Sequence, residues 1–211
     1  MRLRDYHNIL WIGAHPDDEL SISALVNYTR IDDVIFNMVS VTAGESCEYN
    51  NEPKYIDFNC SAAYFGADNA KILYYRNLST IDLKGKVEID IINNWCNLEY
   101  DLQEIINDIK PDLIITIDPN VAFGGHLEHK VLFHFIKKAL HNSEYSCEVW
   151  GSTSKLIWDD KSLSIVADEN YFGSEPKHAK NIYRMHSCFS IETLSKLTMR
   201  QETGLKKLCY T

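Results

Sequence analysis

The 211-residue sequence lacks any apolar stretch near the roughly 20 residues that a transmembrane helix needs. Its start is also unlike an export signal, because the short apolar run after two arginines stops at a histidine and three acidic residues. We therefore expect a cytoplasmic protein. Internal repeats, low-complexity tracts and linker-like shifts in composition are absent too, so residues 1–211 are predicted to form a single domain with a sizeable core.

Closely spaced cysteines are also lacking. The six cysteines are Cys47, Cys60, Cys96, Cys147, Cys188 and Cys209. None of them forms a C-x-x-C pair, which argues against a zinc ribbon or a redox motif. Without an export signal, a disulfide framework is not expected in a chain of this size. The cysteines are therefore predicted to be free thiols.

Positively charged residues are fewer than negatively charged ones. Lys and Arg number 21 against 30 Asp and Glu, which gives a net charge of −9. A field of this sign repels nucleic acid and anionic membrane surfaces, so we expect neither as a partner. A cationic metal is the more natural ligand for the acidic clusters, and a small molecule is the expected substrate. The sequence carries no indication of an oligomeric state.

Strand-like apolar runs alternate with helical patterns along the chain. The predicted strands are Asn8–Gly13, Val34–Thr42, Lys71–Tyr75, Leu113–Ile117, Glu148–Ser152 and Leu163–Ala167. The predicted helical segments are Asp18–Thr29, Tyr55–Phe65, a long helical region somewhere within Ile89–Lys110 that Pro111 ends, His126–Leu140, Pro176–Met185 and Ile191–Arg200. This alternation predicts an α/β fold, a mostly parallel sheet with helices on both faces. In such folds, ligands bind beyond the carboxyl ends of the strands.

The first chemically unusual segment is AHPDDE at Ala14–Glu19, directly after a predicted strand. It holds one imidazole and three carboxylates within five residues. Pro16 restricts the backbone, which allows His15 and Asp18 to curl toward one point. The alternative is an ordinary helix start, because acidic residues favour the first helical turn and Asp is a good N-cap.

The second segment is GGHLEH at Gly124–His129, after the predicted strand Leu113–Ile117. His126 and His129 are three residues apart and share a face of the helix that they open. The glycines allow the backbone to approach a ligand closely. The alternative is a glycine-rich turn that carries two surface histidines.

The two segments together indicate a metal site, because both follow strands whose carboxyl ends lie at one edge of the sheet. One His and one Asp from the first segment, with one His from the second, make a set of three N/N/O ligands. Catalytic zinc commonly has three protein ligands and an open position for water. Structural zinc sites usually have four ligands, often cysteines, and the cysteine spacing does not fit such a site.

At these residues the chain resembles the PIG-L/LmbE-like zinc-dependent N-acetylglucosaminyl deacetylases. The resemblance rests on AHPDDE at Ala14–Glu19 and GGHLEH at Gly124–His129. Weaker matches to the family pattern are Val41–Glu45, Ala62–Gly66, Pro111–Thr116 and Lys180–Ser187. The matches extend from Ile9 to Ser187, which is nearly the whole chain.

The resemblance implies a Rossmann-like fold and the hydrolysis of an N-acetyl group on an N-acetylglucosamine-type sugar or sugar conjugate. It implies that His15, Asp18 and His129 bind one zinc ion, for which Fe²⁺ or Co²⁺ can substitute. Asp17 is then the general base, and His126 stabilises the oxyanion. Either Asp17 or His126 protonates the leaving amine.

The sequence departs from the family pattern in three places. Glu128 stands where the family usually has Asp, and the R-x-x-E of the family's second helix has only Lys54–Asp57 as its nearest match. The late H-S-Q reads His186-Ser187-Cys188. His186 either contacts substrate or is simply favoured by the dipole at a helix C-terminus. The last two departures bear on the identity of the substrate more than on the metal chemistry.

Glu128 is predicted to act in catalysis by orienting His126 and raising the pKa of its imidazole. The alternative is that Glu128 points to solvent in the first helical turn, where its charge favours the helix dipole.

Two other functions fit parts of the pattern. A phosphorelay receiver domain also has an acidic pair after its first strand, but the predicted third strand ends in Tyr74-Tyr75-Arg76, without the Asp that a receiver needs. The second is a family member that acts on a non-sugar amide or binds zinc without catalysis. All five chemical positions of the family are filled, which argues against the loss of catalysis.

Overall fold

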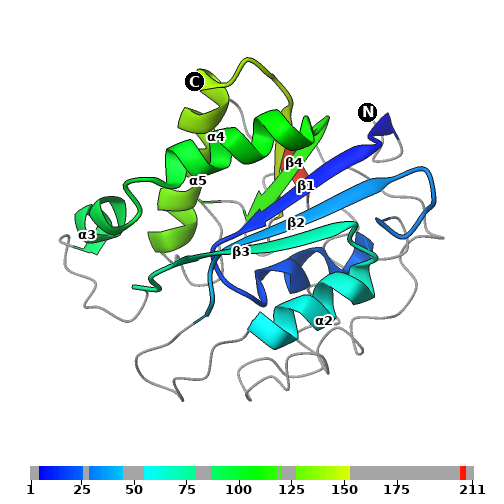
Figure 1. Cartoon of the computed structure of the whole chain (residues 1–211), viewed down its shortest axis with the longest axis horizontal. Helices are drawn as coiled ribbons and strands as arrows, with labels where there is room; N and C mark the ends of the chain where they lie inside the picture. Colours follow the sequence, from blue (N-terminus) through cyan, green and yellow to red (C-terminus); the bar gives the residue numbers. More distant parts are fainter. Residues whose placement is uncertain are drawn as a thin grey trace.

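The computed structural model describes residues 5–25, 29–44, 55–78, 87–117, 119, 127–152 and 205–207. Its centre is one sheet of six strands in the order β3-β2-β1-β4-β5-β6 (Figure 1). The strands are β1 (Asn8–Gly13), β2 (Ile35–Thr42), β3 (Asn69–Tyr75), β4 (Leu113–Ile117), β5 (Glu148–Ser152) and β6 (Leu205–Lys207). The first five are parallel, and β6 pairs antiparallel with β5. The predicted α/β class with a mostly parallel sheet is confirmed.

Helices cover both faces of the sheet (Figure 1). They are η2 (Asp18–Leu25), a 3-10 helix, and the α-helices α2 (Tyr55–Phe65), α3 (Val87–Asn94), α4 (Leu98–Ile109) and α5 (Leu127–Asn142). Residues of η2 and α2 pack on one face, and residues of α3, α4 and α5 pack on the other. No helix in the described ranges has both the length and the apolar character that a membrane span requires.

Strand β1 is buried on both sides because its side chains alternate between two cores. Leu10 and Ile12 belong to the core under α3, α4 and α5. Ile9 and Trp11 belong to the core under η2 and α2. All four are fully buried. Burial on both faces explains why this strand reads as a continuous apolar run instead of alternating with polar residues.

The predicted strands lie within two residues of their observed bounds wherever the structure describes them. The predicted helix Tyr55–Phe65 is confirmed, and Gly66 follows it with a positive φ of 70° that suits glycine. The predicted segments Leu163–Ala167, Pro176–Met185 and Ile191–Arg200 lie outside the described residues. The short strand β6 was not predicted, since three residues carry too little pattern to identify.

The long helical region predicted within Ile89–Lys110 is helical in the structure, but it is divided into two helices, α3 and α4. Trp95 lies between them, fully buried, and its indole Nε1 donates to the carbonyl oxygen of Arg76 at 3.0 Å. The amide of Leu98 donates to the carbonyl of Trp95 at 2.8 Å, which closes the turn. No Pro or Gly marks this break in the sequence. The burial of Trp95 overrides the local helical pattern.

The predicted helix Asp18–Thr29 is instead the shorter 3-10 helix η2, whose regular geometry is interrupted at Ile22. Long 3-10 runs are uncommon, and here the segment is held by tertiary contacts. The hydroxyls of Ser21 in η2 and Ser152 at the end of β5 are hydrogen-bonded at 2.8 Å and buried. This bond fixes the segment that begins with Asp18 against the sheet edge.

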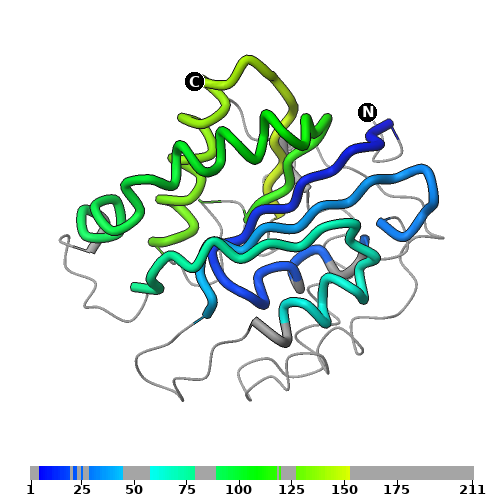
Figure 2. The backbone as a smooth tube through the Cα atoms, viewed as in Figure 1, coloured from blue at the N-terminus to red at the C-terminus, as the bar shows by residue number. Residues whose placement is uncertain are grey.

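Strands β1 and β4 lie side by side although they are far apart in the sequence (Figure 2). After β1 the chain continues to β2 and β3 on one side of this pair, and after β4 it continues to β5 on the other side. The chain segments that leave β1 and β4 therefore diverge at a topological switch point. In open α/β sheets, this is the place where ligands bind.

Candidate metal centre

The segment after β1 is a tight turn that brings His15 and Asp18 together. The amide of Asp18 donates to the carbonyl of His15 at 3.3 Å, and the amide of His15 donates to Oδ2 of Asp18 at 2.8 Å. Thr42, at the end of β2, donates from its amide and its hydroxyl to the carbonyl of Ala14, both at 2.9 Å. These hydrogen bonds from β2 thus fix the backbone just before His15.

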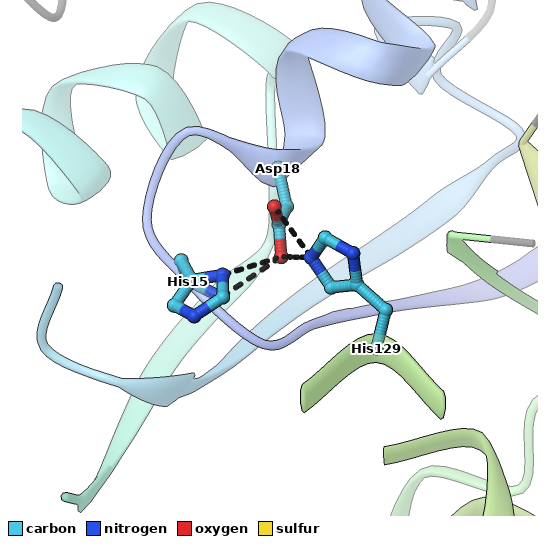
Figure 3. Close-up of side chains that lie close together, drawn as sticks. All are labelled: His15, Asp18 and His129. Atoms are coloured by element: carbon cyan, nitrogen blue, oxygen red, sulfur yellow. Dashed lines mark hydrogen bonds and ion pairs between the residues drawn. The ribbon is translucent and has the colours of Figure 1, made fainter. Parts of the chain in front are cut away.

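His129 comes to the same point from α5, after β4. Its Nε2 lies 3.1 and 3.2 Å from the two carboxylate oxygens of Asp18. The His15 ring meets the His129 ring edge-on, with centroids 5.4 Å apart, and its Nδ1 lies 3.6 Å from Asp18 Oδ2. Figure 3 shows the carboxylate of Asp18 between the two imidazoles. One ligand atom from each residue lies within 4.8 Å of the others, and all three residues are buried.

The electrostatics of this cluster favour an ionised carboxylate on Asp18 and a protonated imidazole on His15. Burial alone raises the pKa of the Asp18 carboxyl, but the imidazoles of His129 and His15 outweigh it and hold that pKa well below its usual range. Burial also lowers the pKa of His15, yet the carboxylates of Asp18 and Glu128 raise it to about 10. The metal-free cluster therefore carries a proton on His15 at neutral pH.

The carboxylate of Glu128 is fully buried and has two partners. Its Oε2 lies 2.5 Å from Nε2 of His15, and its Oε1 accepts a hydrogen bond from the amide of Leu78 at 2.6 Å. Glu128 therefore does not point to solvent, which excludes the alternative considered for it. The predicted contact between Glu128 and His126 lies outside the described residues and stays a prediction. The contact between Glu128 and His15 was not predicted from the sequence. The Glu128 carboxylate is held in place by the backbone amide of Leu78, after β3, and a backbone amide leaves no signal in the sequence.

Asp17 and Glu19 complete the acidic run in different surroundings. Asp17 is half-buried and has a φ of 102°, in the left-handed region that side chains rarely adopt. Its amide donates to Oε2 of Glu19 at 3.1 Å. Glu19 is fully buried, and burial raises the pKa of its carboxyl to about 8. The three acids of the motif are thus not equivalent.

Several predicted residues lie outside the described ranges. They are His126, Gly124, Gly125, Glu45, His186, Ser187 and Cys188. The described residues of the two motifs, His15, Asp18, Glu128 and His129, meet at one point, as the strand order requires. The proposed roles of His126 and His186 remain predictions.

The donor set fits a divalent metal ion. Two imidazole nitrogens and a carboxylate from three buried residues converge at the edge of the sheet. Zinc commonly takes His and Asp ligands in sets of three at catalytic sites. The cysteines that the structure describes, Cys60, Cys96 and Cys147, form no disulfide and take no part in the cluster. The chemistry of the donors therefore suits a catalytic ion better than a closed structural one.

Residues 10–140 match the PIG-L family, whose description is GlcNAc-PI de-N-acetylase. The sequence matches no curated protein. The structure is similar to that of N,N'-diacetylchitobiose deacetylase from Pyrococcus horikoshii, with a TM-score of 0.67 and 15% identity over 97% of this chain and 85% of that chain.

Two further solved structures are similar. A deacetylase of the teicoplanin biosynthesis pathway has a TM-score of 0.65 and 14% identity over 94% of this chain and 95% of that chain. GalB, the 4-carboxy-2-hydroxymuconate hydratase from Pseudomonas putida KT2440, has a TM-score of 0.64 and 11% identity over 97% of both chains. At these identities the likeness shows a shared fold.

Proposed function

This chain belongs to the PIG-L family of GlcNAc-PI de-N-acetylases, and we propose that it is a zinc-dependent hydrolase that removes the N-acetyl group from an N-acetylglucosamine-type sugar. The observation that carries the proposal is the convergence of His15, Asp18 and His129 at the switch point of the sheet. Two of these ligands come from the turn after β1 and one from α5. Such a set leaves coordination positions for water and substrate.

In the proposed mechanism, His15, Asp18 and His129 hold the ion. When bound, the ion would supply Lewis acidity, which lowers the pKa of water so that nucleophilic hydroxide is available at neutral pH, and would polarise the substrate carbonyl. The buried cluster keeps Asp18 ionised, because the two imidazoles favour its charged form. Asp18 is therefore suited to hold a cation and unsuited to accept a proton.

We assign the general base to Asp17. It is half-buried beside the ligand turn, whereas Asp18 is buried and engaged by both imidazoles. Asp17 is thus the carboxylate of the pair that is more exposed to solvent. It takes the proton of the attacking water, and His126 stabilises the charge that grows on the carbonyl oxygen. Asp17 or His126 then returns a proton to the leaving amine.

The substrate class rests on what similar proteins act on. Two of the similar structures are deacetylases, one of N,N'-diacetylchitobiose and one in teicoplanin biosynthesis. Both names support an N-acetylated sugar or sugar conjugate for this chain. The similarity to a hydratase of a muconate favours a second candidate, the addition of water to a carboxylated small molecule. The amide chemistry of the matched family makes the deacetylase the stronger proposal.

The experiment is a screen of N-acetylated sugars with zinc-loaded protein, in which free amine and acetate are both quantified. We expect equal release of amine and acetate from at least one N-acetylglucosamine derivative, and none from His129→Ala. The 4-carboxy-2-hydroxymuconate substrate is tested in parallel by its loss of ultraviolet absorbance. Turnover of that compound, with no amine released from any sugar, would favour hydration over deacetylation.

A further inference from the structure

We propose that Glu128 is a positioning residue that fixes the His15 ring so that Nδ1, and not Nε2, faces the metal ion. This inference rests on the metal site proposed above. It also assigns a role to the residue at which this sequence departs from the family pattern. Glu128 touches neither substrate nor metal in this role and acts only through His15.

The contacts of the buried carboxylate determine which ring nitrogen is available. Oε2 of Glu128 lies 2.5 Å from Nε2 of His15. An ionised carboxylate only accepts hydrogen bonds, so Nε2 must carry the hydrogen. In the neutral ring the lone pair then resides on Nδ1, which lies on the side of Asp18, 3.6 Å from its Oδ2. A carboxylate that fixes the tautomer and angle of a metal-binding His raises metal affinity.

The second oxygen of Glu128 anchors the carboxylate itself. Oε1 accepts the amide hydrogen of Leu78 at 2.6 Å, just beyond the end of β3. Leu78 is buried in the core under α3, α4 and α5. One side chain on α5 therefore connects the His15 turn to the segment after β3. With both oxygens engaged, the carboxylate has a fixed direction toward His15.

The length of the side chain matters for this bridge. An Asp at position 128 would be shorter by one methylene, about 1.5 Å, and would have to pull α5 inward to reach both partners. Glu128 spans the distance without leaving the helix. The substitution of Glu for the family's usual Asp is therefore explained by a contact with His15 and Leu78 in this chain.

The direct test is the tautomer of His15 in zinc-loaded wild-type protein, read from the ¹⁵N chemical shifts of labelled histidine. We expect His15 to show a metal-bound Nδ1 and a protonated Nε2. A metal-bound Nε2 on His15 would overturn this inference and leave the proposed function standing. A wild-type protein that binds no zinc at all would contradict both.

Variants test the role of the carboxylate. Glu128→Gln keeps the size but can accept from only one of the two partners through its single oxygen, and Glu128→Asp shortens the reach. We expect the zinc dissociation constant to rise about 10- to 100-fold in both. Glu148→Gln is the matched control, because Glu148 accepts hydrogen bonds from Tyr6 and Trp150 away from the site. Wild-type zinc affinity in Glu128→Gln would contradict the inference.

Discussion

Asp17 and Asp18 have the same side chain and adjacent positions, yet the structure gives them different surroundings. Asp18 is buried between two imidazoles, which hold the pKa of its carboxyl well below its usual range. Asp17 is half-buried and has a positive φ of 102°, which is strained for residues other than glycine, although Asp and Asn adopt positive φ more readily than other side chains. Strained residues of this kind often occur at functional sites. This contrast supports different roles for the two residues: Asp18 binds the metal ion and Asp17 transfers protons.

Asp17→Asn separates the two roles. Asn keeps the shape of Asp and tolerates a positive φ, so the turn and the metal site should be unchanged. The loss of the basic oxygen should lower kcat by about 100-fold or more. Steady-state kinetics and zinc content are measured on the same samples. Near-normal kcat in the zinc-loaded variant would mean that another group is the base.

Asp17→Gly tests the strain at this position. Glycine adopts a φ of 102° at little steric cost, so the variant should be more stable than wild type by about 1 kcal/mol while it loses activity. Urea unfolding of the metal-free proteins measures this difference. Asp17→Ala is the control, because it removes the carboxylate and keeps a Cβ atom at this positive φ. Equal stability of the Gly and Ala variants would show that no strain is stored there.

Proton release on metal binding follows from the pKa of His15. In the metal-free protein this pKa is raised to about 10, because the carboxylates of Asp18 and Glu128 outweigh the effect of burial. His15 is then protonated at neutral pH and must lose a proton to become a ligand. Zinc affinity should therefore increase as pH rises, by about tenfold per pH unit between about pH 7 and 9.

Calorimetry in buffers of different ionisation enthalpy measures this proton count directly. Asp18 should add nothing to it, since its carboxyl is ionised in both states. A binding enthalpy that is independent of the buffer would contradict the protonated state of His15. Binding that weakens as pH rises through this window would contradict it as well.

The sequence placed His15, Asp18 and His129 together because two strand ends of a parallel sheet share an edge. That argument needs only the pattern of strands and the motif positions. The contact between Glu128 and His15 could not be predicted in the same way. It depends on the direction of α5 and on a backbone amide at Leu78, and neither leaves a signal in side-chain identity.

At the scale of elements, β1 shows how a single glycine permits a packed strand. A Cβ atom built on Gly13 would lie 1.9 Å from the indole ring of Trp11, two residues earlier on the same face of the strand. Trp11 is fully buried in the core under η2 and α2. The end of β1 that leads to His15 therefore depends on the absence of a side chain at residue 13.

Gly13→Ala should destabilise the protein by about 1–3 kcal/mol, since the indole has to move within a packed core. Chemical denaturation measures the loss. The double variant Trp11→Leu/Gly13→Ala is the control for the mechanism, because a smaller side chain at residue 11 removes the clash. The two substitutions should then be less harmful together than the sum of the single effects, and strict additivity would rule out this steric explanation.

The elements that the sequence predicted well are those whose pattern is local. Strands β1 and β4 are mostly apolar runs, β2 is rich in apolar and β-branched residues, and α2 is followed by Gly66. The break between α3 and α4 was missed because its cause is distant: the indole of Trp95 bonds to the carbonyl of Arg76, beyond β3. Similarly, η2 is held by a bond between Ser21 and Ser152, which are 131 positions apart.

At the scale of the whole molecule, the metal site joins segments from both halves of the chain. His15 and Asp18 follow β1, and His129 belongs to α5 after β4. A ligand that binds only the folded state stabilises it by mass action, by about 4 kcal/mol at a concentration one thousand times its Kd. For a protein of this size, that corresponds to an increase in Tm of about 8–16 °C.

Zinc titration followed by differential scanning calorimetry checks this linkage. The Tm of wild type should rise with zinc concentration, and that of His129→Ala should not. The same titration with magnesium is a specificity control, because Mg²⁺ prefers oxygen ligands to imidazole. An unchanged Tm of wild type in excess zinc would be incompatible with a metal site between the two halves.

The central claim, that His15, Asp18 and His129 together hold a catalytic metal ion, is tested most directly by metal analysis of purified variants. Wild type should contain about one divalent ion per chain, and His15→Ala, Asp18→Ala and His129→Ala should each lose it. His134→Ala, an exposed histidine on α5, should keep it. Full metal content in all three cluster variants would contradict the claim.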